Sequence, residues 1–395
     1  MRILVAHNFY QQPGGEDTTR TAEIALLRGY GHEVYEYIET NQRIEQMSPV
    51  SVAFQTIWSL PSYQRIRQTL AECKPDIVHF HNTFPLISPA GYHACRAVGV
   101  PVVQTIHNFR VTCLSATFTR DGRVCEDCLG KRIPWPGILH RCYHGSLTHS
   151  AVVAGYLVTH HTLRTWRQQV DAYIVLTEFA KAKLVQAGLP AHKLHIKPQC
   201  IFPDPGARPA MAGDYALYVG RLSPEKGLPT LLRAWAQVPA EIPLKIVGDG
   251  PLKQSLQELA QRLKLRNVEF VGQVDRSVVL KLMKQARLLV FPSECYEGYP
   301  LTITEALACG LPVLASRLGA MATILRDGDT GLLFAPGDAE DLAAQVQWAW
   351  THPDDLLRIS QNGRAQYENE NSPEKNYLIL MDIYRAAGQA RAARQ

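Results

Sequence analysis

The fold is decided by the stretch FPSECYEGYPLTITEALACGLPVLAS, residues 291–316. An apolar run ends at Phe291, and a loop that contains glycine and proline follows it. A helix is predicted from near Thr302 to Gly310, and another apolar run comes directly after it. Apolar runs that alternate with single helices are typical of a parallel α/β sheet, because each helix carries the chain back to the starting edge.

The same stretch carries two carboxylates, Glu297 and Glu305, which are separated by seven residues. This spacing places Glu297 in the loop and Glu305 in the first turns of the helix. The first backbone amides of a helix lack partners within it and lie at its positive end, so they attract a diphosphate. Carboxylates there can accept hydrogen bonds from ribose or sugar hydroxyls. We therefore predict a binding site that comprises Glu297, Gly298, Tyr299, Pro300, Leu301, Thr302 and Glu305.

A second cluster, YVGRLSPEKG at residues 218–227, follows another apolar run. Arg221 and Lys226 lie five residues apart across a turn that contains Pro224. Folded back, both cations would reach one diphosphate, since guanidinium and ammonium groups both bind phosphate oxygens. The alternative is an exposed turn with two solvated cations, and the nearby carboxylate segment makes that interpretation the weaker one.

The alternation of apolar runs with helices extends through the whole chain and is interrupted once. Residues 198–213 contain four prolines and little periodicity, which is typical of a linker. We predict a first domain at 1–198, a linker at 199–213, a second domain at 214–371, and a last helix with its tail at 372–395.

Each predicted domain has its own set of strands. Those before the linker are Ile3–Ala6, Val34–Ile38, Ile77–Phe80, Val102–Ile106 and Tyr173–Leu176; those after it are Tyr215–Val219, Leu244–Val247, Val268–Val271, Leu288–Phe291, Val313–Ala315 and Leu332–Phe334. The helix predicted between the first two strands has an apolar stripe of Ala22, Ala25, Leu26 and Leu27 and ends at Gly31.

Composition excludes several classes of protein. The chain has 395 residues, of which 46% are hydrophobic and 19% charged, as is ordinary for a globular enzyme of two domains. No stretch approaches the ~20 apolar residues of a membrane span. The start MRILVAHNFY predicts a buried strand rather than a signal peptide, so we expect a cytoplasmic protein. The net charge of +5 is mild and does not indicate nucleic acid as a partner.

In the order of these motifs the chain resembles the retaining glycosyltransferases of family 4, which have the GT-B fold. The resemblance rests on Glu297 and Glu305, on Arg221 and Lys226, and on the glycine loop PGGEDT at residues 13–18. It implies two Rossmann-like α/β/α domains that face a central cleft, with the acceptor on the side of the first domain and the nucleotide sugar bound by the second. The last helix is then expected to cross back to the first domain. It also implies transfer of a hexose-type sugar from a UDP- or GDP-linked donor to a glycan or lipid-linked acceptor, in the synthesis of cell-surface polysaccharide or glycolipid.

The resemblance also assigns roles to residues. It makes His107, which follows the run Val102–Ile106, the active-site histidine, acting together with Glu297, Arg221 and Lys226. It implies that the acceptor hydroxyl attacks on the face that the diphosphate leaves, and that the diphosphate takes the acceptor proton. Gly14 and Gly15 let the backbone approach a phosphate closely. No cofactor or metal is expected in catalysis, and Asp327-Gly-Asp329 is predicted to be a turn rather than a metal site.

Four polar residues of the first domain have open roles. His79 and His81 flank Phe80 near a strand end, and His81 either contacts the acceptor or is structural. Glu16 and Asp17 follow the glycine loop. They either cap the next helix, where acidic groups are favoured, or contact the acceptor or the sugar.

Four cysteines cluster in the polar segment 112–145, which we assign to the first domain as an insertion: Cys113, Cys125, Cys128 and Cys142. A set of four thiols with a central C-x-x-C suits structural zinc, and His140 or His144 would be substitute ligands. Reduced thiols and a redox or iron–sulfur role are the alternatives. The other five cysteines lie in apolar surroundings and are predicted to be buried, reduced thiols.

Basic and aromatic residues in and after the same segment indicate peripheral contact with an anionic membrane at its inner face, or else an ordinary solvated surface. They are Arg120, Arg123, Lys131, Arg132, Trp135, Arg141, Arg164, Trp166 and Arg167.

Two other classes of function stay open. One is another GT-B enzyme, such as a nucleotide-sugar epimerase or a phosphorylase, and the other is a non-catalytic nucleotide-sugar-binding subunit. An epimerase needs no acceptor, and nothing in the sequence marks the pyridoxal-linked lysine that a phosphorylase normally carries. A binding subunit gives no turnover, whereas in a transferase Glu297→Ala should abolish transfer yet spare folding.

Overall fold

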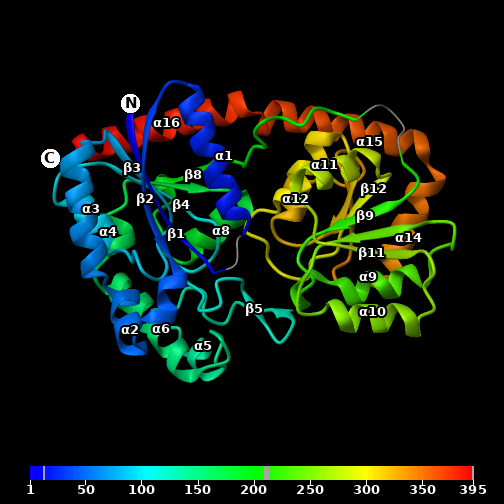
Figure 1. Ribbon diagram of the computed structural model, residues 1–395, viewed down its shortest axis with the longest axis horizontal. Coiled ribbons are helices and arrows are strands. Elements are labelled where there is room, and N and C mark those ends of the chain that lie inside the picture. The colour runs from blue at the N-terminus through cyan, green and yellow to red at the C-terminus, as the bar shows by residue number, and fades with distance from the viewer. Residues whose placement is uncertain (12–13, 209–212, 394–395) are drawn as a thin grey trace. The chain divides into compact units, whose positions relative to one another are not determined.

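The computed structural model describes residues 1–11, 14–208 and 213–393, and the chain divides into two compact units. Unit 1 comprises Met1–Phe118, Glu126–Pro198 and the C-terminal segment from Glu374, and unit 2 comprises Thr119–Cys125 and Gln199–Pro373. Each unit contains its own six-stranded sheet (Figure 1). Pro13 of the predicted glycine loop and residues 209–212 of the predicted linker lie outside the described residues.

The sheet of unit 1 is entirely parallel and has the strand order β2-β1-β3-β4-β7-β8. Its strands are β1 (Arg2–Phe9), β2 (Glu33–Thr40), β3 (Ile77–Asn82), β4 (Val102–Thr105), β7 (Ala172–Val175) and β8 (Leu194–Ile196). The helices of this unit are α1 (Gly15–Gly29), α2 (Pro49–Ile57), α3 (Leu60–Cys73), α4 (Ala90–Arg96), α5 (Trp135–Leu139), α6 (Leu147–Thr162), α7 (Thr165–Gln168), α8 (Glu178–Gln186) and α16 (Pro373–Ala392).

All five strands predicted for the first half are confirmed. β1, β3, β4 and β7 are buried almost throughout, whereas β2 lies at the edge of the sheet and Ile38 is exposed there. Ile3 and Leu4 of β1 point to opposite faces of the sheet, and neither exposes any surface. β8 was not predicted. The apolar stripe of α1 was wrong in part: Ala25 is exposed, while Ile24 and the charged Glu23 are buried.

The sheet of unit 2 is also parallel and has the order β11-β10-β9-β12-β13-β14, with apolar cores on both of its faces. Its strands are β9 (Ala216–Val219), β10 (Leu244–Val247), β11 (Val268–Gly272), β12 (Leu288–Phe291), β13 (Val313–Ser316) and β14 (Leu332–Phe334). The helices are α9 (Leu228–Trp235), α10 (Lys253–Arg262), α11 (Arg276–Gln285), α12 (Leu301–Cys309), α13 (Met321–Ile324), α14 (Ala339–Thr351) and α15 (Pro353–Gln366). All six strands predicted for this half are confirmed.

A short antiparallel hairpin, β5 (Thr119–Arg120) and β6 (Arg123–Val124), lies in the segment that groups with unit 2. Its sequence belongs to the insertion that we assigned to the first domain. The grouping follows from contacts in space, which sequence position does not report.

The last helix, α16, packs on unit 1 although the residues just before it belong to unit 2. The Tyr384 hydroxyl lies 2.8 Å from Nδ1 of His79, and the ring of Tyr377 stacks on Tyr30 at 3.7 Å between centroids. The predicted return of this helix to the first domain is therefore confirmed. Within the described residues, no helix is both long and apolar enough to cross a bilayer.

Candidate active site

Two loops of unit 2 bring together residues that the sequence analysis singled out. Lys226 ends a short 3-10 turn after β9, and Glu297 lies in the loop between β12 and α12. Nζ of Lys226 donates to Oε1 of Glu297 at 2.6 Å, and the Ser293 hydroxyl donates to the same oxygen at 2.6 Å. Burial alone would lower the pKa of Lys226, but the carboxylate of Glu297 outweighs it and the pKa is raised. The ammonium therefore stays charged.

The two loops can approach because the residue after Lys226 is glycine. Gly227 has φ of 68°, and a Cβ placed on it would lie 1.9 Å from the carbonyl oxygen of Pro292. Any other side chain would therefore push the loop of Lys226 away from the loop of Glu297. A similar packing holds the turn after β10, since a Cβ on Gly248 would lie 2.0 Å from the carbonyl oxygen of Gly220.

Helix α12 begins at Leu301, and its N-cap residue, Pro300, supplies no side-chain hydrogen bond. The first amides of α12 thus lie at the positive end of the helix without a side-chain cap. Glu305, predicted to lie in the first turns of this helix, does so; it is 9% exposed, and its Oε1 accepts from Nε of Arg276 at 2.9 Å. Arg276 begins α11 and was not predicted as part of the site.

The remaining predicted residues of unit 2 lie in the same two loops, with different environments. The side chain of Arg221 is exposed, and its backbone oxygen accepts from the Tyr218 hydroxyl at 3.0 Å. Tyr299 points its hydroxyl at Nδ2 of Asn371, 2.7 Å away, and burial raises the pKa of Tyr299 to about 12. Gly298 and Thr302 flank this segment and are half-buried.

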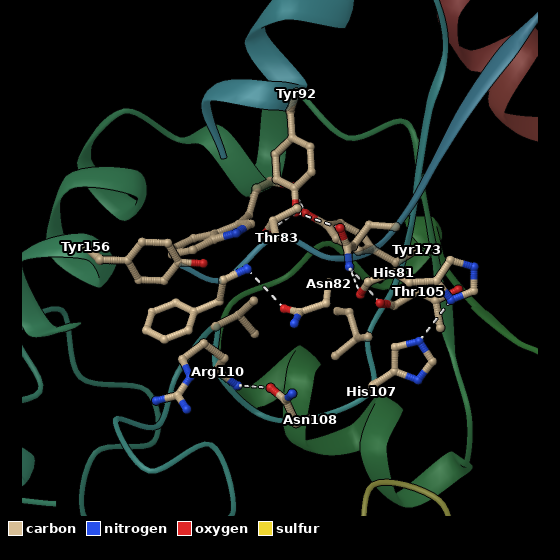
Figure 2. Close-up of a pocket in the computed structure, with 15 residues that line it drawn as sticks. His81, Asn82, Thr83, Tyr92, Thr105, His107, Asn108, Arg110, Tyr156 and Tyr173 are labelled. Atoms are coloured by element: carbon tan, nitrogen blue, oxygen red, sulfur yellow. Dashed lines mark hydrogen bonds between the residues drawn. The ribbon is translucent and has the colours of Figure 1, made fainter. Parts of the chain in front are cut away.

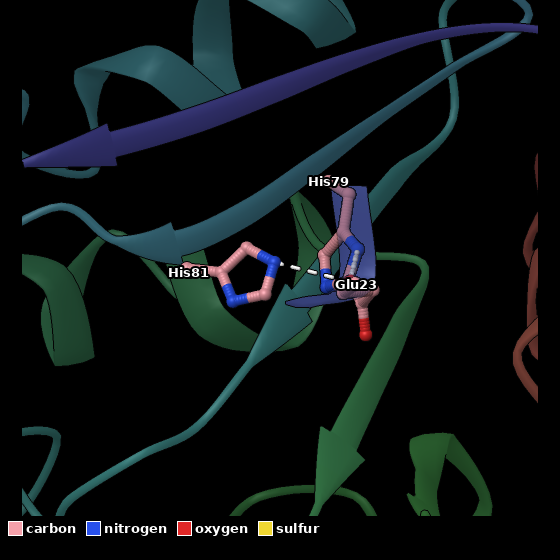
Figure 3. Close-up of side chains that lie close together, drawn as sticks. All are labelled: Glu23, His79 and His81. Atoms are coloured by element: carbon pink, nitrogen blue, oxygen red, sulfur yellow. Dashed lines mark hydrogen bonds and ion pairs between the residues drawn. The ribbon is translucent and has the colours of Figure 1, made fainter. Parts of the chain in front are cut away.

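In unit 1, His107 follows β4 and lies at the end of a buried polar chain. His107 Nε2 lies 3.1 Å from Nδ1 of His81, and Nε2 of His81 lies 3.1 Å from Oε1 of Glu23 (Figures 2 and 3). The other carboxylate oxygen of Glu23 accepts from Nζ of Lys197 at 2.8 Å. Glu23 and Lys197 are 4% and 3% exposed, so this ion pair is inside the unit.

The protonation of this chain follows from its contacts. Burial alone would raise the pKa of Glu23, but Lys197 and His79 outweigh it and hold it well below its usual range. Burial and the neighbouring His79 lower the pKa of His81 to about 3, and burial lowers the pKa of His107 as well. Both imidazoles are therefore neutral.

The tautomer of His107 is then determined. Ionised Glu23 can only accept, so the proton of His81 is on Nε2 and its Nδ1 is an acceptor. Nε2 of His107 must therefore carry a proton and donate to His81. This leaves Nδ1 of His107 as a hydrogen-bond acceptor for another molecule.

His79 is structural, because both of its ring nitrogens contact other side chains of unit 1. Its Nδ1 contacts the Tyr384 hydroxyl and Oε1 of Glu23, and its Nε2 lies 2.7 Å from Oγ1 of Thr105. The ligand atoms of Glu23, His79 and His81 are close enough to hold a metal ion. The ammonium of Lys197 already binds this carboxylate, and its positive charge opposes a cation there, so we assign the cluster to positioning.

The glycine loop of unit 1 starts α1. Gly14 is the N-cap residue and Gly15 the first residue of the helix; the amide of Gly14 donates to Oδ2 of Asp17 at 2.8 Å, which confirms a capping role for Asp17. The other oxygen of Asp17 lies 2.8 Å from Nε2 of the buried His7. Glu16 does not cap. Its Oε1 is buried without a partner among the described residues, and burial, then the charge of Asp17, raise the pKa of Glu16 to about 8.

A small cavity opens beside His107 and His81 (Figure 2). It encloses about 40 Å³, room for a water molecule or two rather than a sugar. Asn82, Thr83 and Asn108 give it a polar lining, and Arg110, which lies over the ring of Phe84 at 4.6 Å, closes one side.

Two further predictions concern metal sites. Among the described residues, the groups of three ligand atoms that lie within 4.8 Å of one another do not include Cys113, Cys125, Cys128 or Cys142, so the structure gives structural zinc no support. None of the nine cysteines forms a disulfide, and the five scattered ones are buried as predicted. Asp327-Gly-Asp329 is a turn: Gly328 has φ of 71°, and Oδ1 of Asp327 accepts from the amide of Leu333 at 2.9 Å.

Sequence reasoning missed Glu23, Lys197 and Arg276. Charged residues are mostly exposed, and nothing in the pattern of α1 marks Glu23 as an exception. The available signal was indirect: three histidines follow or flank strand ends, and a buried neutral histidine needs an acceptor or a donor nearby.

Comparisons with known proteins find the same family in both halves of the chain. The family models described as Glycosyltransferase Family 4 and Glycosyl transferases group 1 match residues 24–204 and 208–366. The D-rhamnosyltransferase WbpZ of Pseudomonas aeruginosa is 25% identical over 79% of this chain and 73% of its own length. The phosphatidyl-myo-inositol mannosyltransferase of Mycolicibacterium smegmatis is 25% identical over 92% of this chain and 88% of its own. The crystal structure of Anabaena HepE in complex with UDP has a TM-score of 0.71 and 20% identity, covering 97% of this chain and 99% of that one.

Proposed function

Because this chain belongs to the family 4 glycosyltransferases, a retaining family with the GT-B fold, we propose that it transfers a hexose-type sugar from a UDP- or GDP-linked donor to a glycan or lipid-linked acceptor. The product would be a cell-surface polysaccharide or a glycolipid. Among the relatives, the rhamnosyltransferase and the inositol-lipid mannosyltransferase are named for sugar transfer, and HepE was solved with UDP and with UDP-glucose.

The observation that carries the proposal is the contact of Lys226 with Glu297 at 2.6 Å, in the loop that leads into the start of α12. It places a charged ammonium, a carboxylate and helix amides in one part of unit 2. In the proposed complex, Lys226, Arg221 and the first amides of α12 bind the diphosphate. Glu305 accepts from the ribose hydroxyls, and Glu297 from hydroxyls of the sugar.

The proposed reaction needs no protein nucleophile. The acceptor hydroxyl attacks the anomeric carbon on the face from which the diphosphate leaves, the bond from that carbon to the diphosphate oxygen breaks, and this oxygen takes the acceptor proton. The protein stabilises the charge that develops on the diphosphate, and removal of one such donor typically costs ~10²–10³ in rate. Nδ1 of His107 accepts a hydrogen bond from a sugar hydroxyl. No metal or cofactor takes part in this scheme.

A lipid-linked acceptor would be met at a bilayer surface. The proposed function therefore includes peripheral contact of unit 1 with an anionic membrane. Basic residues of the predicted insertion would bind the anionic headgroups.

The proposal is tested first by nucleotide binding. UDP, GDP, ADP and their common sugars are screened by thermal unfolding without added metal. A nucleotide present at about 100 times its Kd adds about 2.7 kcal/mol of stability, a shift of a few degrees. We expect one base to be preferred, and the shift to disappear in Arg221→Ala and Glu305→Ala.

The matched control is Arg262→Ala, an exposed arginine at the end of α10 in the same unit, which should keep the full shift. An assay for transfer of radiolabelled sugar from the donor to an extract that contains acceptor then distinguishes the proposed transferase from the alternative functions. Isomerised donor without an acceptor would assign an epimerase, and binding without any turnover would assign a non-catalytic subunit. A screen in which no nucleotide raises the unfolding temperature would overturn the donor site itself.

A further inference from the structure

Unit 1 exposes large apolar side chains on neighbouring elements. Helix α6 packs against both α2 and α5, and Figure 1 shows these three helices beside one another at the lower left. The exposed side chains are on α2, the first residue of α3, α5 with the residues before it, and the first residue of α6. We call this set the apolar face; it comprises Val50, Phe54, Leu60, Ile133, Trp135, Leu139 and Leu147, each at least 52% exposed.

The arrangement of these residues on their helices is regular. Val50 and Phe54 of α2 are four residues apart, and so are Trp135 and Leu139 of α5, so each pair projects from one side of its helix. Soluble proteins seldom gather exposed apolar side chains, and such gatherings mark interaction sites. In unit 2, by contrast, Val278 of α11 and Val124 of the hairpin are the large apolar side chains exposed among the described residues.

The same elements are free of negative charge. Residues 46–71, which include α2, and residues 128–170, which include α5 and α6, contain no Asp or Glu, although the chain has 36. Lys131, Arg132 and Arg141 are exposed and flank Ile133, Trp135 and Leu139 directly in sequence. An ordinary solvated surface mixes both signs of charge, so this surface is not explained by solubility alone.

The structure also corrects the set of residues that we assigned to membrane contact. Trp166 is 3% exposed and packs inside unit 1, and Arg120 and Arg123 lie in the hairpin that groups with unit 2. Trp135 stays in the set because 56% of it is exposed.

We propose that the apolar face, with Lys131, Arg132 and Arg141, docks unit 1 on an anionic lipid bilayer. Apolar side chains enter the boundary between headgroups and acyl chains, where tryptophan is favoured, while lysine and arginine meet the anionic headgroups. A second copy of the chain fits this surface poorly, because each copy would bring the same positive charges to the interface. The choice of a lipid surface agrees with a lipid-linked acceptor, and in that respect it rests on the proposed function.

The test measures binding of the full chain to vesicles by sedimentation, without any sugar donor, so its outcome is independent of the transfer assay. Vesicles of phosphatidylcholine are compared with vesicles that also contain phosphatidylglycerol. We expect binding to the anionic vesicles alone, and weaker binding as salt is added. Lys131→Gln with Arg132→Gln should weaken binding about fivefold for each charge removed. Trp135→Ser with Leu139→Ser should weaken it further.

Matched controls remove the same groups elsewhere. Arg262→Gln with Arg266→Gln takes two exposed charges from unit 2, and Leu378→Ser takes a side chain that is 58% exposed on α16; both should bind vesicles as the unaltered chain does. Equal binding to both vesicle types, no binding to either, or unchanged binding by the variants of the apolar face would each overturn the proposal. Self-association that these variants abolish, without vesicle binding, would assign the face to a second copy.

Discussion

At Glu23, burial disfavours the ionised carboxylate, and the neighbouring groups favour it. The carboxylate is 4% exposed and depends on Lys197 and on two histidines to remain ionised inside unit 1. Loss of one partner from a buried pair leaves the other charge without compensation, which costs about 3–5 kcal/mol, whereas removal of both charges costs far less. Glu23→Gln should therefore destabilise the chain by about that amount, and Lys197→Met should recover much of the loss when added to it. Urea unfolding followed by circular dichroism measures both.

The matched control is Asp382→Asn, on helix α16. Asp382 binds Arg385 at 2.8 Å, but the two side chains are 70% and 68% exposed, so water replaces the lost contact. A cost for Glu23→Gln no larger than that for Asp382→Asn would contradict the role of burial at Glu23.

Glu16 gives the chain a pH dependence of known sign. Its pKa is about 8 in the folded chain, mainly because of burial, against 4.5 for a free side chain. Between these values the folded chain holds a proton that the unfolded chain has released, so the contribution of Glu16 to stability falls as pH rises. Glu16→Gln should thus melt near the temperature of the unaltered chain at pH 4.5 and a few degrees above it at pH 8.

The variant to compare with Glu16→Gln is Asp17→Asn, at the neighbouring residue. Asp17→Asn weakens the cap on Gly14 and the contact with His7, so it should lower the melting temperature at both pH values. A melting temperature of Glu16→Gln that tracks the unaltered chain across the whole range would show that Glu16 is ionised and solvated in the fold.

The sequence predicts the strands much better than it predicts which side chains contact one another. Runs such as Leu244–Val247 and Leu288–Phe291 are apolar at every second residue or more, and their observed bounds are those predicted. β8 was missed because LHI, with a histidine in the middle, is short and half-buried. The helix after Tyr299 was also predictable, since Pro300 precedes it and Gly310 ends it with φ of 67°.

The contacts that link Lys197 to His107 through Glu23 and His81 could not be predicted from the sequence. These residues come from α1, from the ends of β3 and β4, and from the segment after β8, and sequence alone does not report which strand lies next to which. The residues of unit 2 were easier, because Glu297 and Glu305 are close in sequence. Arg276, the partner of Glu305, was missed because it begins a different helix, α11.

Gly227 lies where the two loops of the candidate donor site approach each other most closely. Gly227→Ala places a methyl group against the Pro292 carbonyl, so it should separate Lys226 from Glu297 and weaken nucleotide binding as well as stability. Gly328→Ala is the matched control, because Gly328 has φ of 71° and nothing within 4 Å of a Cβ. It shares the cost of a positive φ without the clash. Thermal shifts with nucleotide should fall in Gly227→Ala and persist in Gly328→Ala.

The stability of unit 1 depends on helix α16. Helix α16 buries Leu380, Ile383 and Tyr384, and burial of each such side chain contributes about 1.5–3 kcal/mol. The sum is comparable with the whole stability of a domain, about 5–15 kcal/mol. Deletion of residues 374–395 should therefore abolish cooperative unfolding of unit 1, while unit 2, which has its own cores, keeps its response to nucleotide. Calorimetry with and without nucleotide separates the two transitions.

Leu378→Ser provides the control for that deletion, since Leu378 is on the same helix and 58% exposed; both transitions should stay where they were. A truncated chain that still shows both transitions would mean that the sheet of unit 1 is stable without α16.

The return of the last helix to unit 1 also orders events during synthesis. Unit 2 is complete once residue 373 has left the ribosome, whereas unit 1 still lacks the helix that covers His79. A ribosome adds about 5–20 residues per second, so the first segment of unit 1 spends roughly 10–40 seconds incomplete while residues 199–395 are made. The nascent chain thus presents an open apolar surface near its beginning and a finished domain behind it. Chaperones that bind unfolded segments should be found on the residues of unit 1 that precede Gln199 rather than on unit 2.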